Sequence, residues 1–416
     1  MRPAIASLLL LAACSAPDGP ADMEQATITD SAGITIVQNH HPVWGVGEGW
    51  KVSAEPVLVI ADTLATSEGR WILRSTRLPN GDVVLITDAN GRWFDSTGTL
   101  RQVFALKGGG PGEFEYAPSH LVQMSGDSIA VGSVGFRTKV NIYSPDGALE
   151  RVMQVERERL NALGRWRECG TYLLPDLSQI GCQRDDSLPS SGLGHEDEGE
   201  TLKPGLLRQF ARHYRVPASV DTAYMLGVDI GLEQQIVQVG SNISSMMHPF
   251  HARGVFAAGG TPLLLVSASN LAYGIEVRTP EGKLTHTIRR DGGRRAPTDA
   301  ERAAADSTLR SGEGYYGTMD PSRREQILAA LDTPDSLPAH AGLWVARTGE
   351  ILSQRWSQWN GDAPKVFDVF GRDGRWLGEI SLPPRFLLHE IGEDYLIGVQ
   401  LDEDDAHSLV VYRLRR

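Results

Sequence analysis

Residues 108–147 read GGGPGEFEYAPSHLVQMSGDSIAVGSVGFRTKVNIYSPDG, and this stretch decides how the whole chain is interpreted. It opens on consecutive glycines, with Lys107 directly before them. Glycine-rich loops that bind phosphate carry GxxxxGK[ST] after a strand, or GxGxxG at the start of a helix. Here the lysine precedes the glycines, Glu113 stands where GxGxxG ends, and Pro118 would interrupt a helix. We therefore favour a structural connector over a nucleotide-binding loop.

Short β-rich runs follow the glycines and recur along the chain. Each ends in a polar turn that closes on a glycine, which supplies the positive φ that a tight hairpin needs. These turn glycines are Gly98, Gly147, Gly282 and Gly374. The first two are separated by about 40–50 residues, the period typical of propeller blades with four strands each.

Counting these patterns predicts six units, over residues 70–105, 119–155, 165–217, 252–290, 340–382 and 386–414. The last unit holds only two or three convincing strands. Residues 27–38 or 56–61 could supply the missing strand, because a radial array leaves exposed edges unless its first and last units join. We predict an all-β, six-bladed β-propeller, with residues 27–416 as one domain closed by an N-terminal strand.

Helical patterns are confined to residues 297–332, between the fourth and fifth units. Thr298 and Glu301 have the spacing of a capping box, and Asp320 followed by Pro321 is typical of a helix N-cap and first position. We therefore expect a small helical insertion that covers or buttresses one face of the propeller.

Residues 108–147 resemble the NHL repeat, which runs G-x-G-P-G-x-F, then Pro, a buried strand, a polar loop with Arg, and a strand ending in Asp-Gly. The resemblance implies that the glycines lead from the outer strand of one blade to the inner strand of the next, and that Phe114 packs between blades. The chain is also similar to exported bacterial six-bladed propeller lipoproteins, through ITDSAGITIVQN (28–39), one GPGEF motif and LPAHAGLWVARTGEILSQRW (337–356). That similarity implies a fold rather than a ligand.

The N-terminus has the pattern of an export signal. Arg2 precedes a short apolar run that cannot span a bilayer but matches a secretory signal. LAAC at 11–14 resembles a lipobox, whose cysteine becomes the lipidated N-terminus. We expect residues 1–13 to be a lipoprotein signal peptide and residues 14–26 to be a flexible tether. Cys14 would then anchor the chain by its acyl groups, with an ordinary signal peptide as the alternative.

The same resemblance places the protein in the outer membrane, facing the periplasm or the cell surface, because Ser15 rather than Asp follows the cysteine. The formal net charge is −12, and basic residues form no concentrated patch. Phosphate binding needs such a patch, so we expect no nucleic-acid partner.

Two further cysteines, Cys169 and Cys182, bracket the segment CGTYLLPDLSQIGC. Folding this segment at its Pro-Asp centre pairs Tyr172 with Gln179 and brings the two cysteines face to face. In an oxidising compartment this predicts a disulfide, with two buried thiols as the alternative.

The sequence contains few motifs that indicate catalysis or ligand binding. The motifs HExxH, GxSxG and CxxC are missing from the sequence, and we assign no catalytic residue, cofactor or metal. MMHPFHARG (246–254) places His248, His251 and Arg253 just before an inner strand, where a ligand could reach the channel mouth; a surface loop is the alternative. The acidic run LDEDDAH (401–407) predicts a solvated hairpin tip rather than a calcium site.

Two classes of function remain. The first is a monomeric, non-catalytic binding or scaffold module that recognises an envelope protein, peptide or glycan while Cys14 holds it to the membrane. The second is a metal-dependent hydrolase or lyase of the six-bladed lactonase type. That type needs Glu, Asn and Asp side chains from different blades converging on the axis, and the sequence assigns no such set. We favour the binding module and leave enzyme activity undecided.

Overall fold

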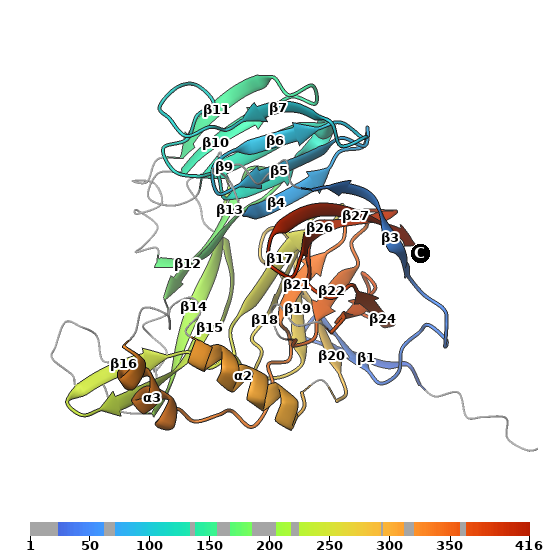
Figure 1. The fold of residues 1–416 in the computed structure, drawn as a ribbon. Coiled ribbons are helices and arrows are strands. Elements are labelled where there is room, and N and C mark those ends of the chain that lie inside the picture. Colours follow the sequence, from blue (N-terminus) through green and yellow to red (C-terminus); the bar gives the residue numbers. More distant parts are fainter. Residues whose placement is uncertain are drawn as a thin grey trace, which may run out of the picture.

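The computed structural model describes residues 24–61, 71–133, 138–155, 167–184, 205–217, 224–292, 294–311, 320–357 and 363–416. Strands dominate these ranges, and the α-helices are α2 (Asp299–Ser311) and α3 (Pro321–Ala329). Neither helix, nor any other described helical segment, has the length and apolar character needed to cross a bilayer. The strands form six sheets, which we number as blades one to six in chain order (Figure 1). The predicted all-β propeller with a helical insertion is thus confirmed.

The first three blades come from the first part of the chain. Blade one has the order β4 (Ile72–Arg77), β5 (Val83–Thr87), β6 (Gly91–Phe94), β7 (Leu100–Phe104). Blade two contains β8 (His120–Gln123), the short turn η1 (Ser125–Asp127), β9 (Ile129–Ser133), β10 (Thr138–Tyr143) and β11 (Leu149–Val155). Blade three contains β12 (Arg167–Leu173), β13 (Gln179–Arg184), β14 (Gly205–Val216), β15 (Tyr224–Val239) and β16 (Asn242–Met246).

The other blades combine later strands with N-terminal ones. Blade four contains β17 (Val255–Gly259), β18 (Leu264–Ala268), β19 (Gly274–Arg278) and β20 (Leu284–Arg290), extended by β2 (Ile34–Asn39) and β1 (Ala26–Ser31). Blade five contains β21 (Gly342–Val345), β22 (Ile351–Gln354), β23 (Lys365–Phe370) and β24 (Trp376–Leu382). Blade six contains β25 (Phe386–Ile391), β26 (Tyr395–Leu401), β27 (His407–Arg415) and β3 (Lys51–Ile60).

The core is a ring of hydrophobic clusters between successive blades. Each blade is apolar on both faces, as in β5, whose residues are all buried. Each interface has its own cluster with residues of both blades. From the interface of blades one and two round to that of six and one, residues that share a cluster are Val84 and Leu121, Ala130 and Leu173, Leu174 and Leu265, Val277 and Leu343, Leu352 and Leu388, and Val411 and Leu85. Because the last cluster joins blade six to blade one, the ring is closed.

One turn geometry recurs between the third and fourth strands of the blades. The N–H of Asp95 donates to the carbonyl of Thr99, and the N–H of Gly98 donates to the carbonyl of Asp95. The loop therefore holds three residues and ends on Gly98 at φ 87°. Equivalent pairs of bonds close the turns that end on Gly147 and on the two later turn glycines. This left-handed position is why the sequence repeats a glycine there.

The cysteine hairpin uses the same turn, which corrects its predicted register. Leu177, at φ 63°, takes the position that glycine holds elsewhere, so the loop holds three residues instead of the two that Pro-Asp suggested. Tyr172 consequently pairs with Ile180 rather than with Gln179.

The two cysteines are also not opposite each other in the backbone ladder. Arg167, not Cys169, is the partner of Cys182, because β12 is irregular between residues 167 and 172. The side chains of both cysteines lie outside the described residues, so the disulfide stays a prediction.

An N-terminal strand completes the sixth blade. β3 runs antiparallel to β27, with Leu58 opposite Val411 and Val59 opposite Val410 (Figure 1, blue beside red). Residues 27–38, the other segment that the sequence offered, fall in the hairpin β1–β2 instead, and β2 joins β20 of blade four in parallel.

The segment between these strands is fixed to blade five. The N–H groups of Val43 and Trp44 donate to the carbonyls of Trp376 and Leu377, at 3.0 and 2.7 Å. Gly378 allows this approach, because a Cβ there would lie 2.4 Å from the Trp44 ring. Residues 24–61 therefore tie together blades four, five and six.

The glycine run connects blades one and two. The Gly108 N–H donates to the Phe114 carbonyl, and Phe114 is buried in the cluster between the two blades. The Gly110 N–H donates to the Glu113 carboxylate at 2.8 Å, and Asn141 of β10 donates to the Gly112 carbonyl at 2.8 Å. The loop is held by its own carboxylate and by blade two, which fits a connector.

Blade three extends beyond the predicted unit at 165–217, because β15 and β16 add to its outer edge and project from the ring (Figure 1). Helix α3 packs Ile327 against Val237 and Met246 of this projection. The predicted capping box of α2 is present, with reciprocal Thr298–Glu301 bonds, and Asp320 caps α3. The insertion thus buttresses blade three as well as lying between blades four and five.

The closure of blade six predicts a face-dependent effect of substitution in β3. Leu58 packs against the buried cluster between blades six and one, whereas Val57 is 54% exposed on the other face. Leu58→Asp should lower the free energy of unfolding by about 2–4 kcal/mol, because it buries a charge and removes packing. The matched control Val57→Asp should cost about 0.5–1 kcal/mol. Urea denaturation measures both; equal losses would contradict closure through β3.

Candidate functional site

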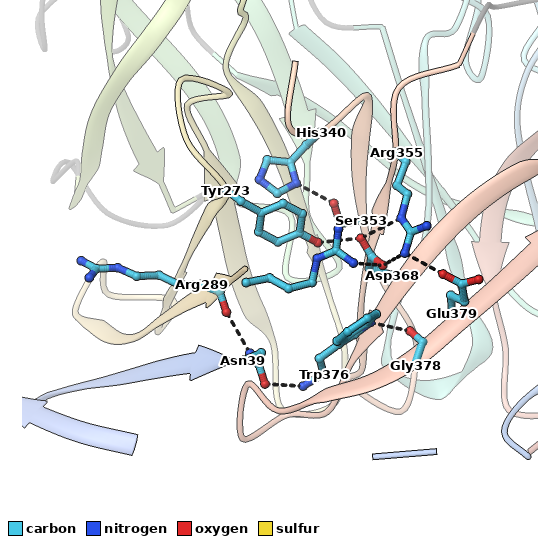
Figure 2. Close-up of polar contacts among 11 residues, drawn as sticks. Asn39, Tyr273, Arg289, His340, Ser353, Arg355, Asp368, Trp376, Gly378 and Glu379 are labelled. Atoms are coloured by element: carbon cyan, nitrogen blue, oxygen red, sulfur yellow. Dashed lines mark hydrogen bonds and ion pairs between the residues drawn. The ribbon is translucent and has the colours of Figure 1, made fainter. Parts of the chain in front are cut away.

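Asp368 is the centre of a buried polar cluster between blades four and five (Figure 2). Its carboxylate lies on β23 and is fully buried. It accepts hydrogen bonds from Tyr273 Oη at 2.9 Å, Arg290 Nη1 at 3.0 Å and Arg355 Nη2 at 2.6 Å. A buried carboxylate is tolerated only when it is paired and hydrogen-bonded in this way.

The positive charges of the two arginines also have further partners. Arg355 also donates to Glu379 at 2.6 Å, and the Arg290 guanidinium lies 4.8 Å from the Tyr273 ring centre and 4.7 Å from that of Trp376. Burial alone lowers the pKa of Arg355, but Asp368 and Glu379 outweigh it, so its pKa rises. Burial, reinforced by Asp368, raises the pKa of Tyr273 well above its usual value and keeps its hydroxyl protonated.

Two asparagines clasp the same pair of blades. Asn39, at the end of β2, donates to the carbonyls of Arg289 and Gly374 and accepts from the N–H of Trp376 at 2.7 Å. Asn270, at φ 63°, donates to the carbonyls of Arg253 and His340 at 2.8 and 2.7 Å. The cluster is therefore framed by clasps that cross from blade four to blade five.

His340 and Ser353 form the only described serine–histidine contact in this cluster, at 2.6 Å between Nδ1 and Oγ. Both side chains are fully buried, and His340 Nε2 has no partner among the described residues. Burial, with a smaller effect of Arg290, lowers the pKa of His340 to about 3. A catalytic histidine is instead oriented by an acceptor on its second nitrogen and is basic near neutral pH. The pair has the character of a structural contact.

The sequence-predicted histidines lie in a buried turn. His248 and His251 are 6% and 7% exposed, and the Nδ1 atom of each accepts a backbone N–H bond from within the turn. Phe250 between them packs on Ala305 of α2. Arg253 is exposed, and its Nη2 donates to the Ala341 carbonyl at 3.2 Å. Arg253 thus borders the Asn270 clasp, while the histidines hold the turn together.

The remaining predicted features are the lipidation site Cys14 and the acidic run at 401–407. Cys14 lies outside the described residues. The acidic run at 401–407 is the turn between β26 and β27, where Asp405 binds Arg385, as the predicted hairpin tip requires. Among the described residues, no group of three or more His, Cys, Asp or Glu side chains is placed to hold a metal ion.

A second polar cluster joins blades five, six and one. Glu390 on β25 accepts from Thr76 of β4 at 2.6 Å and pairs with Arg347 at 2.8 Å. Tyr395 also donates to Glu390, and both Arg347 and Arg77 lie over its ring. Like Asp368, this carboxylate is occupied by partners from neighbouring blades.

Sequence reasoning missed both clusters, although a signal was present. His340, Arg347, Ser353 and Arg355 all fall within LPAHAGLWVARTGEILSQRW, the phrase that carries the family resemblance. Its polar residues sit inside apolar β-rich runs, and buried polar residues usually require partners. The partners, however, lie on other blades and have no fixed spacing in the sequence.

Comparison with known proteins is limited to fold. The chain matches no protein-family model and no curated protein sequence. Among solved structures, a protein described as exported, from Bacteroides fragilis, has 11% identity and a TM-score of 0.42, with 92% of this chain and 99% of that chain covered. A member of the duf4221 family from Bacteroides vulgatus has 9% identity and a TM-score of 0.44, with 88% and 99% covered.

A gluconolactonase from Xanthomonas campestris has 13% identity and a TM-score of 0.35, with 88% of this chain and 96% of that chain covered. Likenesses at this level do not bear on ligands or reactions. The assignment of the fold rests on the strand order and the closed ring of interfaces described above.

Three buried or half-buried histidines, His248, His340 and His389, predict acid sensitivity. Burial is the main cause that lowers the pKa of His248 to about 4, and those of His340 and His389 to about 3. Their stabilising effect is complete above the unfolded pKa of about 6.5 and is lost as the pH falls, because only the unfolded chain takes up the protons. Between pH 7 and 5 each of these histidines should lower the free energy of unfolding by on the order of 1–2 kcal/mol.

Denaturation across this pH range measures the loss. His248→Asn keeps an acceptor for the Phe250 N–H but cannot titrate. Between pH 7 and 5 its free energy of unfolding should therefore fall by about 1–2 kcal/mol less than that of the wild type. The exposed His41→Asn is the matched control and should leave the profile unchanged. A wild-type stability that is flat from pH 7 to 5 would contradict the assignment of neutral buried rings.

Proposed function

We propose that this chain is a lipid-anchored β-propeller of the cell envelope, with NHL-like repeats, which acts as a non-catalytic binding or scaffold module for a protein, peptide or glycan. The observation that carries the proposal is the pairing of the two buried polar clusters' carboxylates. Asp368 is occupied by Tyr273 and Arg290 of blade four, and Glu390 by Arg347 of blade five and Tyr395 of its own blade. These acids act as blade-to-blade cross-links.

The lactonase alternative would use such carboxylates differently. A metal site there requires acidic and amide oxygens from several blades to converge on one ion. At Asp368 a cation would have to displace two guanidinium groups, at 3.0 and 2.6 Å, from a fully buried carboxylate. The geometry thus supports a rigid platform, whose exposed faces remain available to a partner, more than it supports a reaction centre.

The envelope location rests on the sequence of the N-terminus. A lipid-modified Cys14 followed by the tether of residues 14–26 would leave the propeller free to rotate at the membrane surface. The first strand of the fold, β1, begins at Ala26, the last residue of this tether.

Cys14→Ser should release the protein from the membrane. The wild-type chain should label with palmitate and sediment with the membranes. The variant should do neither, because the acyl chains on Cys14 are the proposed membrane anchor. Cys182→Ser is the control and should still label and sediment. Palmitate labelling that persists in Cys14→Ser would contradict the lipoprotein assignment.

The binding role predicts a specific envelope partner. Affinity purification of the tagged wild-type chain from detergent-solubilised envelope should co-purify a defined component, and excess purified Cys14→Ser protein should compete it away.

Metal analysis of the same preparation separates the two functions. We expect substoichiometric calcium and zinc after dialysis, and an unchanged melting temperature in EDTA. One equivalent of retained metal, with a melting temperature that falls in EDTA, would favour the hydrolase instead.

A further inference from the structure

Arg74 occupies an unusual position on the inner strand of blade one. β4 is irregular between Ile72 and Arg74, which pair with Thr87 and Ile86, so that Leu73 is left without a partner in β5. Such a bulge re-aims the side chains beside it and is frequent next to binding sites. Arg74 is exposed, although Ile72 and Ser75 of the same strand are only 4% and 6% exposed.

Arg74 lies on β4, the inner strand of blade one, and groups of two other blades interact with its charge. Burial, and after it the charge of Arg74, lowers the pKa of His389 of β25, in blade six. Tyr172 of β12, in blade three, partly offsets the effect of burial on the pKa of Arg74. Blades six, one and three share only the region around the axis, which their inner strands line. Burial by protein lowers the pKa of Arg74, although solvent reaches the side chain. Both features fit a cation that is surrounded by protein and still reached by solvent.

The charge of Arg74 lacks the compensation that Arg290, Arg355 and Arg347 have. Arg74 Nη1 donates to the Leu73 carbonyl at 2.7 Å, and within the described ranges no carboxylate pairs with it. Arg290, Arg355 and Arg347 all bind carboxylates. The bond to Leu73 uses one guanidinium N–H and leaves other N–H donors for a planar, bidentate acceptor.

The neighbouring groups add neutral hydrogen-bonding capacity and an aromatic wall. His389 Nδ1 lies 2.9 Å from Ser75 Oγ, which joins blade six to blade one beside Arg74. Tyr172 packs against Phe256 of β17, with ring centres 5.3 Å apart. The site therefore offers one positive charge, several neutral polar groups and an apolar surface, within a chain whose net charge is −12.

We infer that the propeller axis binds a small organic carboxylate, with the guanidinium of Arg74 as its principal contact and the His389–Ser75 pair and Tyr172 beside it. One fixed guanidinium matches a singly charged, planar carboxylate, whereas a doubly charged phosphate is usually met by several cations or a row of backbone N–H groups. This inference goes beyond the proposed scaffold role and does not depend on it, because a macromolecule can dock on an outer face whatever the axis holds.

The test is ligand-observed NMR and calorimetry on the purified full chain. The probes are acetate, citrate, glucuronate and benzoate, with inorganic phosphate as a separate arm. We expect at least one carboxylate to bind with a dissociation constant in the millimolar range or below. Arg74→Gln should weaken this binding by about tenfold or more, as expected for loss of a charge-assisted bidentate contact. Arg74→Lys, which keeps the charge, should fall between the two.

Arg151→Gln provides the matched control, because it removes the same charge from an exposed position on the outer strand β11. It should bind the probe as the wild type does. Circular dichroism checks the fold of each variant, and if Arg74→Gln does not fold, the comparison of Arg74→Lys with Arg151→Gln decides. Three results would overturn the inference: no carboxylate binds the wild type, phosphate binds more tightly than every carboxylate, or Arg74 substitutions leave binding unchanged.

Discussion

The pairing of β3 with β27 is the constraint on which the rest of the structure depends. Each blade buries both faces against its neighbours, so every interface in the ring requires the blades on either side to be in place. Without β3, blade six would present an open edge and the cluster between blades six and one would lose Leu58 and Ile60. The chain meets this requirement with residues that precede the first blade in sequence.

The same N-terminal segment does more than close the ring. It pairs with β20 in blade four, crosses blade five at Trp376 and Leu377, and then completes blade six. Asn39 marks the step from blade four to blade five, where its amide satisfies three backbone groups. Buried polar groups are stable only when saturated, and their partners define one relative position. The Asn39, Asn270 and Asp368 contacts therefore fix the register between two blades whose apolar faces alone would tolerate sliding.

Much of this fold was predictable from the sequence, and the reasons are local. Turn glycines such as Gly98 and Gly147 require a positive φ, and that requirement leaves a repeated mark in the sequence. The cysteine hairpin was predicted one residue out of register because Leu177 adopts the same conformation without being a glycine. The polar clusters were not predictable, since Asp368 meets Arg290 and Tyr273 through the packing of two blades. Proximity of that kind follows from the fold and has no spacing rule.

Arg74 differs from the arginines that have a structural role in how its charge is compensated. Arg290 and Arg355 share the buried Asp368, and Arg347 holds Glu390, so each charge is cancelled where it lies. An arginine that is surrounded by protein and serves only the fold would be expected to follow the same pattern, because an uncompensated charge with few water contacts destabilises the folded chain. Arg74 departs from it while sitting beside a strand irregularity and facing solvent. Features that cost stability without serving packing are typical of binding sites. The same reasoning that makes Asp368 a cross-link makes Arg74 the residue whose partner is to be sought outside the chain.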